Sequence, residues 1–160
     1  MATYQVRKTI VIGLGGTGRD AVLRMKQKYL ETYGTDRPPT TQFLVFDTAS
    51  TQPLITKNDD RIELSKGEFL HLTVANPGSV AKVNKEVKSW FPKNVPLNAI
   101  NAGAGQIRTL GRLSLFANGN DVYRAISAAF QEVKSLGPNH DLGDFKLIND
   151  SGLVHVIGSM

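Results

Sequence analysis

A glycine-rich turn between an apolar strand and an amphipathic helix constrains the fold of this chain more than any other feature. Residues 9–12 (TIVI) are apolar and mostly β-branched, which is typical of a buried parallel strand. Residues 13–18 (GLGGTG) follow directly. Apolar side chains then recur at helical spacing over residues 21–33, and Gly34 is placed to cap the C-terminal end of that helix. The turn therefore predicts the first half of a βαβ unit.

The remaining apolar runs continue the alternation of strands and helices. Residues 43–46 (FLVF) predict a second buried strand, which completes a right-handed βαβ unit with parallel strands. Further along, the patterns predict a short strand over 61–64, a helix over 78–91, a loop over 92–105, a helix around Leu110 and Leu113, a helix capped by Asn120 and ending at Gly137, and a strand over 153–157. This order predicts the α/β class, with residues 1–160 forming one three-layer, Rossmann-like domain around a mostly parallel sheet.

The composition excludes several classes of protein. The chain has no cysteine, which excludes disulfides, thiolate catalysis and cysteine-ligated metal sites. No apolar run approaches the roughly 20 residues of a membrane span, and no secretory signal opens the sequence, so we expect a cytoplasmic protein without a membrane partner. The net charge of +5 is dispersed along the chain. We therefore expect most basic residues on solvated helix faces and no specific nucleic-acid partner.

Residues 13–18 fit the pattern G-x-G-x-x-G in the strand–helix context that this pattern requires. Glycines let the backbone approach a ligand closely, and the N-terminus of the following helix offers partial positive charge to a phosphate. The candidate phosphate-binding residues are Gly13, Gly15, Gly16, Thr17 and Gly18. The same turn would also suit a junction that only packs helix on strand. The pattern does not choose a nucleotide, and no Gly-Lys-Ser/Thr follows that would make it a Walker A loop.

Asp47 ends the second predicted strand, on the same sheet edge as the glycine turn. In dinucleotide enzymes an acidic residue at this place holds the ribose hydroxyls. An aspartate that only begins a turn before Thr48 explains the sequence equally well. Asp47 and Thr48 are therefore candidate ligand contacts.

A second glycine cluster precedes the helix around Leu110. It consists of Gly103, Ala104, Gly105 and Gln106, and it forms a potential anion nest at a helix N-terminus, or else an ordinary loop. Arg108 and Arg112 lie one turn apart on that helix, where they can face phosphates, although each alone is typical of a surface cation. The three histidines are scattered, which predicts no metal site, and His155 inside an apolar strand predicts a hydrogen-bonded core histidine. No nucleophile motif is present, so the sequence supports phosphate binding better than acid–base catalysis.

Together, these motifs resemble the FtsZ/tubulin superfamily, and the bacterial tubulin-like proteins more than FtsZ itself. IVIGLGGTGRDAVLRM resembles the family's first phosphate loop and helix, and FLVFDTASTQPL resembles its second strand and following loop. INAGAGQIRTLGR is similar to the Gly-Ala-Gly loop with a Gly-Arg after it. LVHVIGSM is similar to the strand that leads into the family's GGGTGTG signature loop. The order of these segments agrees over nearly the whole chain.

The resemblance implies a domain that binds GTP or GDP, with Mg²⁺ expected beside the phosphates. It places Gly15, Gly16, Thr17 and Gly18 on the α- and β-phosphates, Gly103, Ala104 and Gly105 around the γ-phosphate with Gln106 beside them, and Asp47 and Thr48 near the nucleotide. Arg19 stands where the family has an asparagine that contacts the nucleoside, and Asp47-Thr48-Ala49 replaces Asn-Thr-Asp. The sequence ends where the signature loop is expected, so we expect weak or absent GTP hydrolysis and impaired filament formation for these residues alone.

Two other functions remain open at the level of sequence. A dinucleotide-binding module of an oxidoreductase would use Asp47 to hold the adenosine ribose. However, the number of residues between Gly18 and Asp47 is larger than is usual for that motif. A non-catalytic interaction domain would present the stripe formed by Val80, Val83, Val87 and Trp90 to a partner, although core packing is the commoner use of such a stripe.

Overall fold

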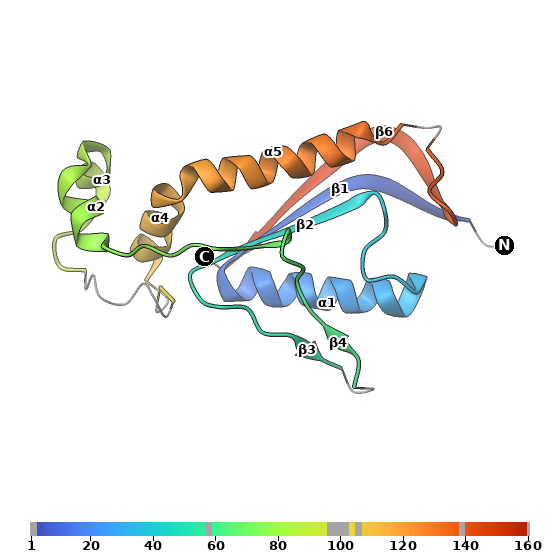
Figure 1. Cartoon of the computed structure of the whole chain (residues 1–160), viewed down its shortest axis with the longest axis horizontal. Coiled ribbons are helices and arrows are strands. Elements are labelled where there is room, and N and C mark those ends of the chain that lie inside the picture. The colour runs from blue at the N-terminus through green and yellow to red at the C-terminus, as the bar shows by residue number, and fades with distance from the viewer. Residues whose placement is uncertain (1–2, 57–58, 96–102, 105–106, 138–139, 160) are drawn as a thin grey trace.

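A four-stranded parallel sheet forms the centre of the molecule (Figure 1). The computed structural model describes residues 3–56, 59–95, 103–104, 107–137 and 140–159. The sheet has the order β5-β2-β1-β6, with β1 at Tyr4–Leu14, β2 at Thr41–Asp47, β5 at Phe69–His71 and β6 at Phe145–Gly158. Every pairing in this sheet is parallel, which confirms the prediction of a mostly parallel sheet.

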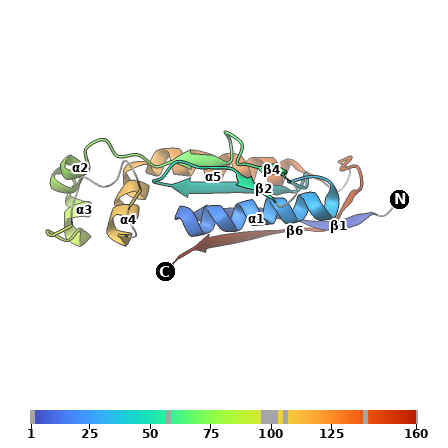
Figure 2. The same ribbon diagram turned by 90° about the horizontal axis from the view of Figure 1, so that it is seen from below.

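Two long helices cover the two faces of this sheet. Helix α1 (Gly15–Tyr33) lies against one face and α5 (Gly119–Ser135) against the other (Figures 1 and 2). Successive β1 side chains point to opposite faces, so Val11 packs toward α1 while Ile10 and Ile12 pack toward α5. The α1-side cluster contains Val11, Val22, Leu23, Phe43, Val45, Ile62 and Leu64, and the α5-side cluster contains Ile10, Ile12, Leu44, Phe46, Leu72, Ala129 and Val133. The three predicted layers are thereby confirmed.

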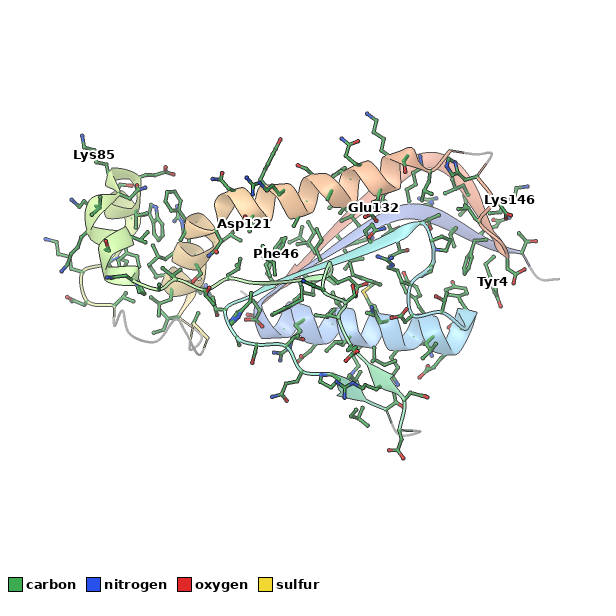
Figure 3. All side chains as sticks on the ribbon, viewed as in Figure 1. Tyr4, Phe46, Lys85, Asp121, Glu132 and Lys146 are labelled. Carbon is green, nitrogen blue, oxygen red and sulfur yellow. The ribbon has the colours of Figure 1, made fainter. Side chains whose placement is uncertain are left out.

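Three short helices pack around a separate apolar cluster beyond the ends of the central strands (Figure 1). They are α2 (Pro77–Val83), α3 (Lys85–Trp90) and α4 (Arg108–Ala117). Figure 3 shows Lys85 of this group and Tyr4 of β1 at opposite ends of the molecule. The prediction of one continuous helix over 78–91 is wrong, because Asn84 has an extended backbone (φ −81°, ψ 118°). Its side-chain oxygen accepts hydrogen bonds from the N–H groups of Glu86 and Val87, so a new helix begins there.

Strand β1, paired on both sides, extends well beyond the predicted residues 9–12. Its partner β6 likewise begins before the predicted residue 153, because backbone pairing continues past the apolar positions that mark a strand in sequence. The short strand β5 was not predicted. The segment 61–64 contributes β4 (Arg61–Ile62), which pairs with β3 (Leu54–Ile55) in a separate antiparallel sheet.

The helix ends follow the glycine and asparagine signals with small shifts. Helix α1 begins at Gly15, inside the glycine-rich turn, and Gly34 caps its end with φ +71° and an N–H bonded to the carbonyl of Leu30, as predicted. Asn118, and not the predicted Asn120, precedes helix α5. The helix therefore begins at Gly119, two residues earlier than predicted.

Candidate phosphate site at the carboxyl edge of the sheet

The glycine-rich turn lies where the chain order of the sheet reverses. From β1 the chain moves to β2 and then β5 on one side, and β6 is added on the other side of β1. Ligands of open parallel α/β sheets bind outside the carboxyl ends of the strands at such a reversal. The turn joins the carboxyl end of β1 to the N-terminus of α1, and β6 ends beside it, with Gly158 opposite Leu14.

Two glycines of the turn are required for close packing of helix on strand. A Cβ atom on Gly13 would lie 2.6 Å from the carbonyl oxygen of Gly18, and one on Gly18 would lie 2.5 Å from the carbonyl oxygen of Ile157. Both contacts are with backbone, which cannot move aside as a flexible side chain can. Gly13 and Gly18 therefore serve the packing role that the sequence left open, and they bring α1 against β1 and β6.

Gly15 and Gly16 have no such packing reason. Gly15 adopts φ +65°, which favours glycine, and a Cβ there would meet no chain atom within 4 Å. A Cβ on Gly16 would meet only the guanidinium of Arg19, at 3.8 Å. The first turn of α1 has no side-chain cap and no acidic residue, and Thr17 is exposed beside it. The helix thus presents uncapped N–H groups and open space to a ligand at its positive end.

The carboxyl end of β2 lies next to this turn and carries a buried aspartate. The carboxylate oxygen Oδ1 of Asp47 accepts a hydrogen bond from the N–H of Ala49 at 3.1 Å. The other oxygen, Oδ2, is buried without a hydrogen-bond partner and lies 3.7 Å from Nη1 of Arg19. Arg19 also donates to the carbonyl of Ser50 at 3.4 Å, so it links α1 to the segment after β2.

Thr48 joins the second glycine cluster to the same edge. Its side-chain oxygen accepts the N–H of Ala104 at 2.8 Å, a contact between residues 56 positions apart. Gly103 adopts φ +108°, and a Cβ there would lie 3.6 Å from the side chain of Ala49. The second cluster is therefore held at the end of β2, and the first cluster follows the neighbouring strand β1. Gly105 and Gln106 lie outside the described residues.

The two arginines predicted on the next helix lie in different surroundings. Arg108 is exposed at the first residue of α4. The guanidinium of Arg112 lies over the ring of Trp90, 4.1 Å from its centre, which is a cation–π contact inside the α2–α4 group. Arg112 is therefore occupied by packing, and the structure does not place it against the glycine turn.

The apolar stripe considered as an interaction surface belongs mostly to the core of the α2–α4 group. Val87 is fully buried, and Val80 and Trp90 pack partly against the same cluster. Val83 is 77% exposed, because the break at Asn84 ends α2 there and turns the two short helices relative to each other.

The sequence did not predict that His71 lies at the carboxyl edge, and its prediction for His155 was wrong. The imidazole Nε2 of His71, at the end of β5, lies 3.0 Å from the carbonyl oxygen of Thr48. No sequence pattern marks His71, because the run Phe69–His71 is too short for periodicity and forms a strand only by pairing with the end of β2. The prediction that His155 is a core histidine is wrong, because β6 is an edge strand in the described sheet and the side chain is exposed. Among the described residues no group of three or more His, Asp or Glu side chains is placed to hold a metal ion.

A comparison with protein families supports the resemblance drawn from the motifs. A family model described as tubulin-like matches residues 10–160, which include both glycine clusters and every element from α1 to β6. The chain belongs to the tubulin-like family. No curated protein and no solved structure matches it. The tubulin-like fold accounts for the parallel sheet between two helical layers and for the glycine turn at its carboxyl edge. Within the described part of this tubulin-like chain, no helix has the length and apolarity needed to cross a membrane.

Proposed function

We propose that this tubulin-like chain binds GTP or GDP at the carboxyl edge of its sheet. The observation that carries the proposal is that both glycine clusters lie at this edge: the first follows β1 directly, and the second is bonded through the N–H of Ala104 to Thr48, just after the neighbouring strand β2. Beside it, the open first turn of α1 offers N–H groups that no side chain caps. Tubulin-like proteins generally bind guanine nucleotides, which makes GTP the first ligand to test.

In this proposal the glycines divide between two tasks. Gly15, Gly16 and Thr17 contact the phosphates, because they are open and lie at the helix N-terminus. Gly13 and Gly18 hold the helix close to the sheet and thereby aim its N-terminus. Ala104 donates its N–H to Thr48, so it shapes the second loop, and Gly103 supplies the backbone conformation that an L side chain disfavours.

Mg²⁺, which the family resemblance implies, fits this edge only as a companion of the nucleotide. Mg²⁺ is commonly held by one or two carboxylates together with substrate phosphates. Asp47 is the one carboxylate that the described residues place at the end of β2 beside the glycine turn, and its Oδ2 lacks a hydrogen-bond partner. Because Asp47 is only 6% exposed, the phosphates and water would supply most of the ligands, and Asp47 would act through such a water.

We infer binding with slow turnover. The described residues at this edge include Asp47, which is shielded from water at 6% exposure, and His71, whose Nε2 already contacts the Thr48 carbonyl, so neither is placed to activate a water molecule. Polymerisation is general in the family, and impaired filament formation by these residues alone stays a prediction, as does a location in the cytoplasm.

The dinucleotide alternative is less well supported. A ribose would need an accessible carboxylate at the end of β2, whereas Asp47 is only 6% exposed and its oxygens face Ala49 and Arg19. The match to the tubulin-like family over residues 10–160 points the same way.

Titration of the full chain with fluorescent GTP and with NADH, each with and without Mg²⁺, tests the proposal. We expect saturable binding of GTP and none of NADH. The variant Gly16→Ala should weaken GTP binding by about tenfold, because a methyl group then stands where the phosphate approaches, while thermal stability is unchanged. Gly119→Ala, at another helix start with open space around it, is the matched control. Equal GTP affinity in the Gly16→Ala variant and the wild-type chain would refute this site.

A further inference from the structure

A positive side chain lies at the positive end of α1. The Nη2 atom of Arg19 is 3.8 Å from the point where a Gly16 side chain would begin, so the guanidinium folds back over the first turn of its own helix. Cations are disfavoured at a helix N-terminus, where the backbone dipole already concentrates partial positive charge. The first turn contains no acidic residue to offset this. The arrangement is favourable only when an anion lies beside it.

The anions that now face Arg19 satisfy it incompletely. Its Nε donates to Asp20 at 3.1 Å, but Asp20 is largely exposed, with 68% of its side chain accessible. Its Nη1 lies 3.7 Å from Asp47 Oδ2, which is beyond hydrogen-bond distance, and that oxygen has no other partner. Arg19 and Asp47 therefore form an ion pair without a hydrogen bond, and Arg19 retains donor capacity toward the glycine turn.

Other described arginines near these helices are less suited to the task. Arg112 lies over the ring of Trp90. Arg24 lies further along α1, away from its N-terminus, and its side chain contacts Gln27. Arg19 alone among these three combines partial burial, at 23% side-chain exposure, with a position against Gly16.

We propose that Arg19 recognises the phosphate groups of the ligand. Its guanidinium exchanges the ion pair with Asp47 for a hydrogen bond to a phosphate oxygen. The inference rests on the proposed nucleotide site and names the residue that makes it selective for phosphorylated ligands over neutral nucleosides. A guanidinium makes short, charge-assisted bonds to phosphate, which outcompete a carboxylate held at 3.7 Å. Arg19 also donates to the carbonyl of Ser50, so a movement of its guanidinium toward the phosphate also changes its contact with the segment that follows β2.

Calorimetric titration of the full chain with pyrophosphate, GTP and guanosine tests this role in the Arg19→Gln, Arg19→Lys and Arg24→Gln variants. We expect Arg19→Gln to lose about tenfold in affinity for pyrophosphate and GTP, with little change for guanosine. Arg19→Lys should recover part of the loss, because the charge remains while the planar fork is lost. Arg24→Gln removes the same charge from the same helix and should bind like the wild-type chain.

Three further measurements separate recognition from folding. Thermal unfolding without ligand measures what Arg19→Gln costs the fold, because it leaves the buried Asp47 carboxylate without its ion pair, and both variants should remain folded at the temperature of the titration. Salt should weaken pyrophosphate binding less in Arg19→Gln than in the wild-type chain, since the Debye length falls from about 10 Å at 0.1 M to about 3 Å at 1 M. Asp47→Asn keeps an acceptor for Ala49 while removing the competing charge, so it should raise the affinity for pyrophosphate measured without Mg²⁺.

The outcomes distinguish this inference from the function on which it rests. If the wild-type chain binds GTP and pyrophosphate, and Arg19→Gln binds them as tightly as Arg24→Gln does, the role of Arg19 is overturned and the nucleotide site stands. If the wild-type chain binds neither ligand, the proposed function itself is overturned. A loss of affinity in Arg19→Gln that is equal for guanosine and GTP also overturns the role, because it shows general damage to the site.

Discussion

Replacing Lys26 should destabilise the fold more than replacing any exposed lysine of the same helix. Lys26 is 2% exposed on α1, and Glu68 is 4% exposed just before β5. Their Nζ and Oε2 atoms are 2.7 Å apart, and the N–H of Ser65 donates to the same oxygen at 2.8 Å. Asp36 approaches the ammonium group at 2.9 Å from the surface. The pair thus joins the α1 layer to the segment that leads into an edge strand.

The magnitude follows from what each variant leaves behind. Removing one member of a buried ion pair costs about 3–5 kcal/mol, because the other charge stays buried without compensation. Lys26→Met leaves the Glu68 carboxylate with Ser65 and with Arg37 at 4.0 Å, so we expect about 3 kcal/mol. Glu68→Gln should cost less, about 2 kcal/mol, since Asp36 still pairs with Lys26 and an amide oxygen still accepts from Ser65.

Urea denaturation followed by circular dichroism measures these differences. With an m-value of about 2 kcal/mol/M, a loss of about 3 kcal/mol lowers the midpoint by about 1.5 M. The double variant Lys26→Met/Glu68→Gln should lose less than the sum of the single losses, by about 1–3 kcal/mol. Lys28→Met is the matched control, because Lys28 is two residues away with 76% of its side chain exposed and pairs with Glu31 on the surface, so its change should stay within about 0.5 kcal/mol. If Lys26→Met and Lys28→Met shift the midpoint equally, or if the double variant is simply additive, the reasoning is refuted.

Three further predictions concern packing and pH. Gly18→Ala should lower the free energy of unfolding by about 3 kcal/mol in the same urea assay, because the new methyl group would meet the backbone oxygen of Ile157 at 2.5 Å; unchanged stability would contradict the packing role of that glycine. Burial is the main cause that raises the pKa of Tyr29 above its ordinary value of 10.0, so the folded state holds that proton more tightly than the unfolded state. Stability should therefore be complete below about pH 10 and fall as the pH rises through the folded pKa, and Tyr29→Phe should make the alkaline fall of the melting temperature shallower. Arg112→Gln should change the fluorescence of Trp90, the single tryptophan, and cost about 0.5–1 kcal/mol, and an unaltered emission spectrum would argue against the cation–π contact.

The first βαβ unit was predictable because each of its signals is local. An apolar β-branched run, a glycine turn and an amphipathic repeat lie next to one another in the chain, and the structure has β1, α1 and β2 in that order. The break at Asn84 was less visible, because the apolar spacing continues across it and only the capping preference of asparagine marks the new helix. The strand β5 is too short for periodicity to distinguish it from a loop, and it forms because β2 offers it an edge.

The candidate site was predictable as a set of residues and not as an arrangement. The sequence predicts a phosphate loop at residues 13–18 and contains a second glycine cluster near residue 103, but it did not distinguish packing glycines from open ones. That distinction depends on how closely α1 approaches β1 and β6, which leaves no room at Gly18 and open space at Gly15.

The sequence by itself determined the α/β class, the position of the glycine turn and the family, because these depend on residue types at short spacing. Only the tertiary structure decided which groups meet at the carboxyl edge. It brought Ala104 onto Thr48 across 56 positions, set Arg19 between Gly16 and Asp47, and buried Lys26 against Glu68. Such contacts depend on strand order and on the packing of helices against the sheet, and those are properties of the whole chain that no local pattern encodes.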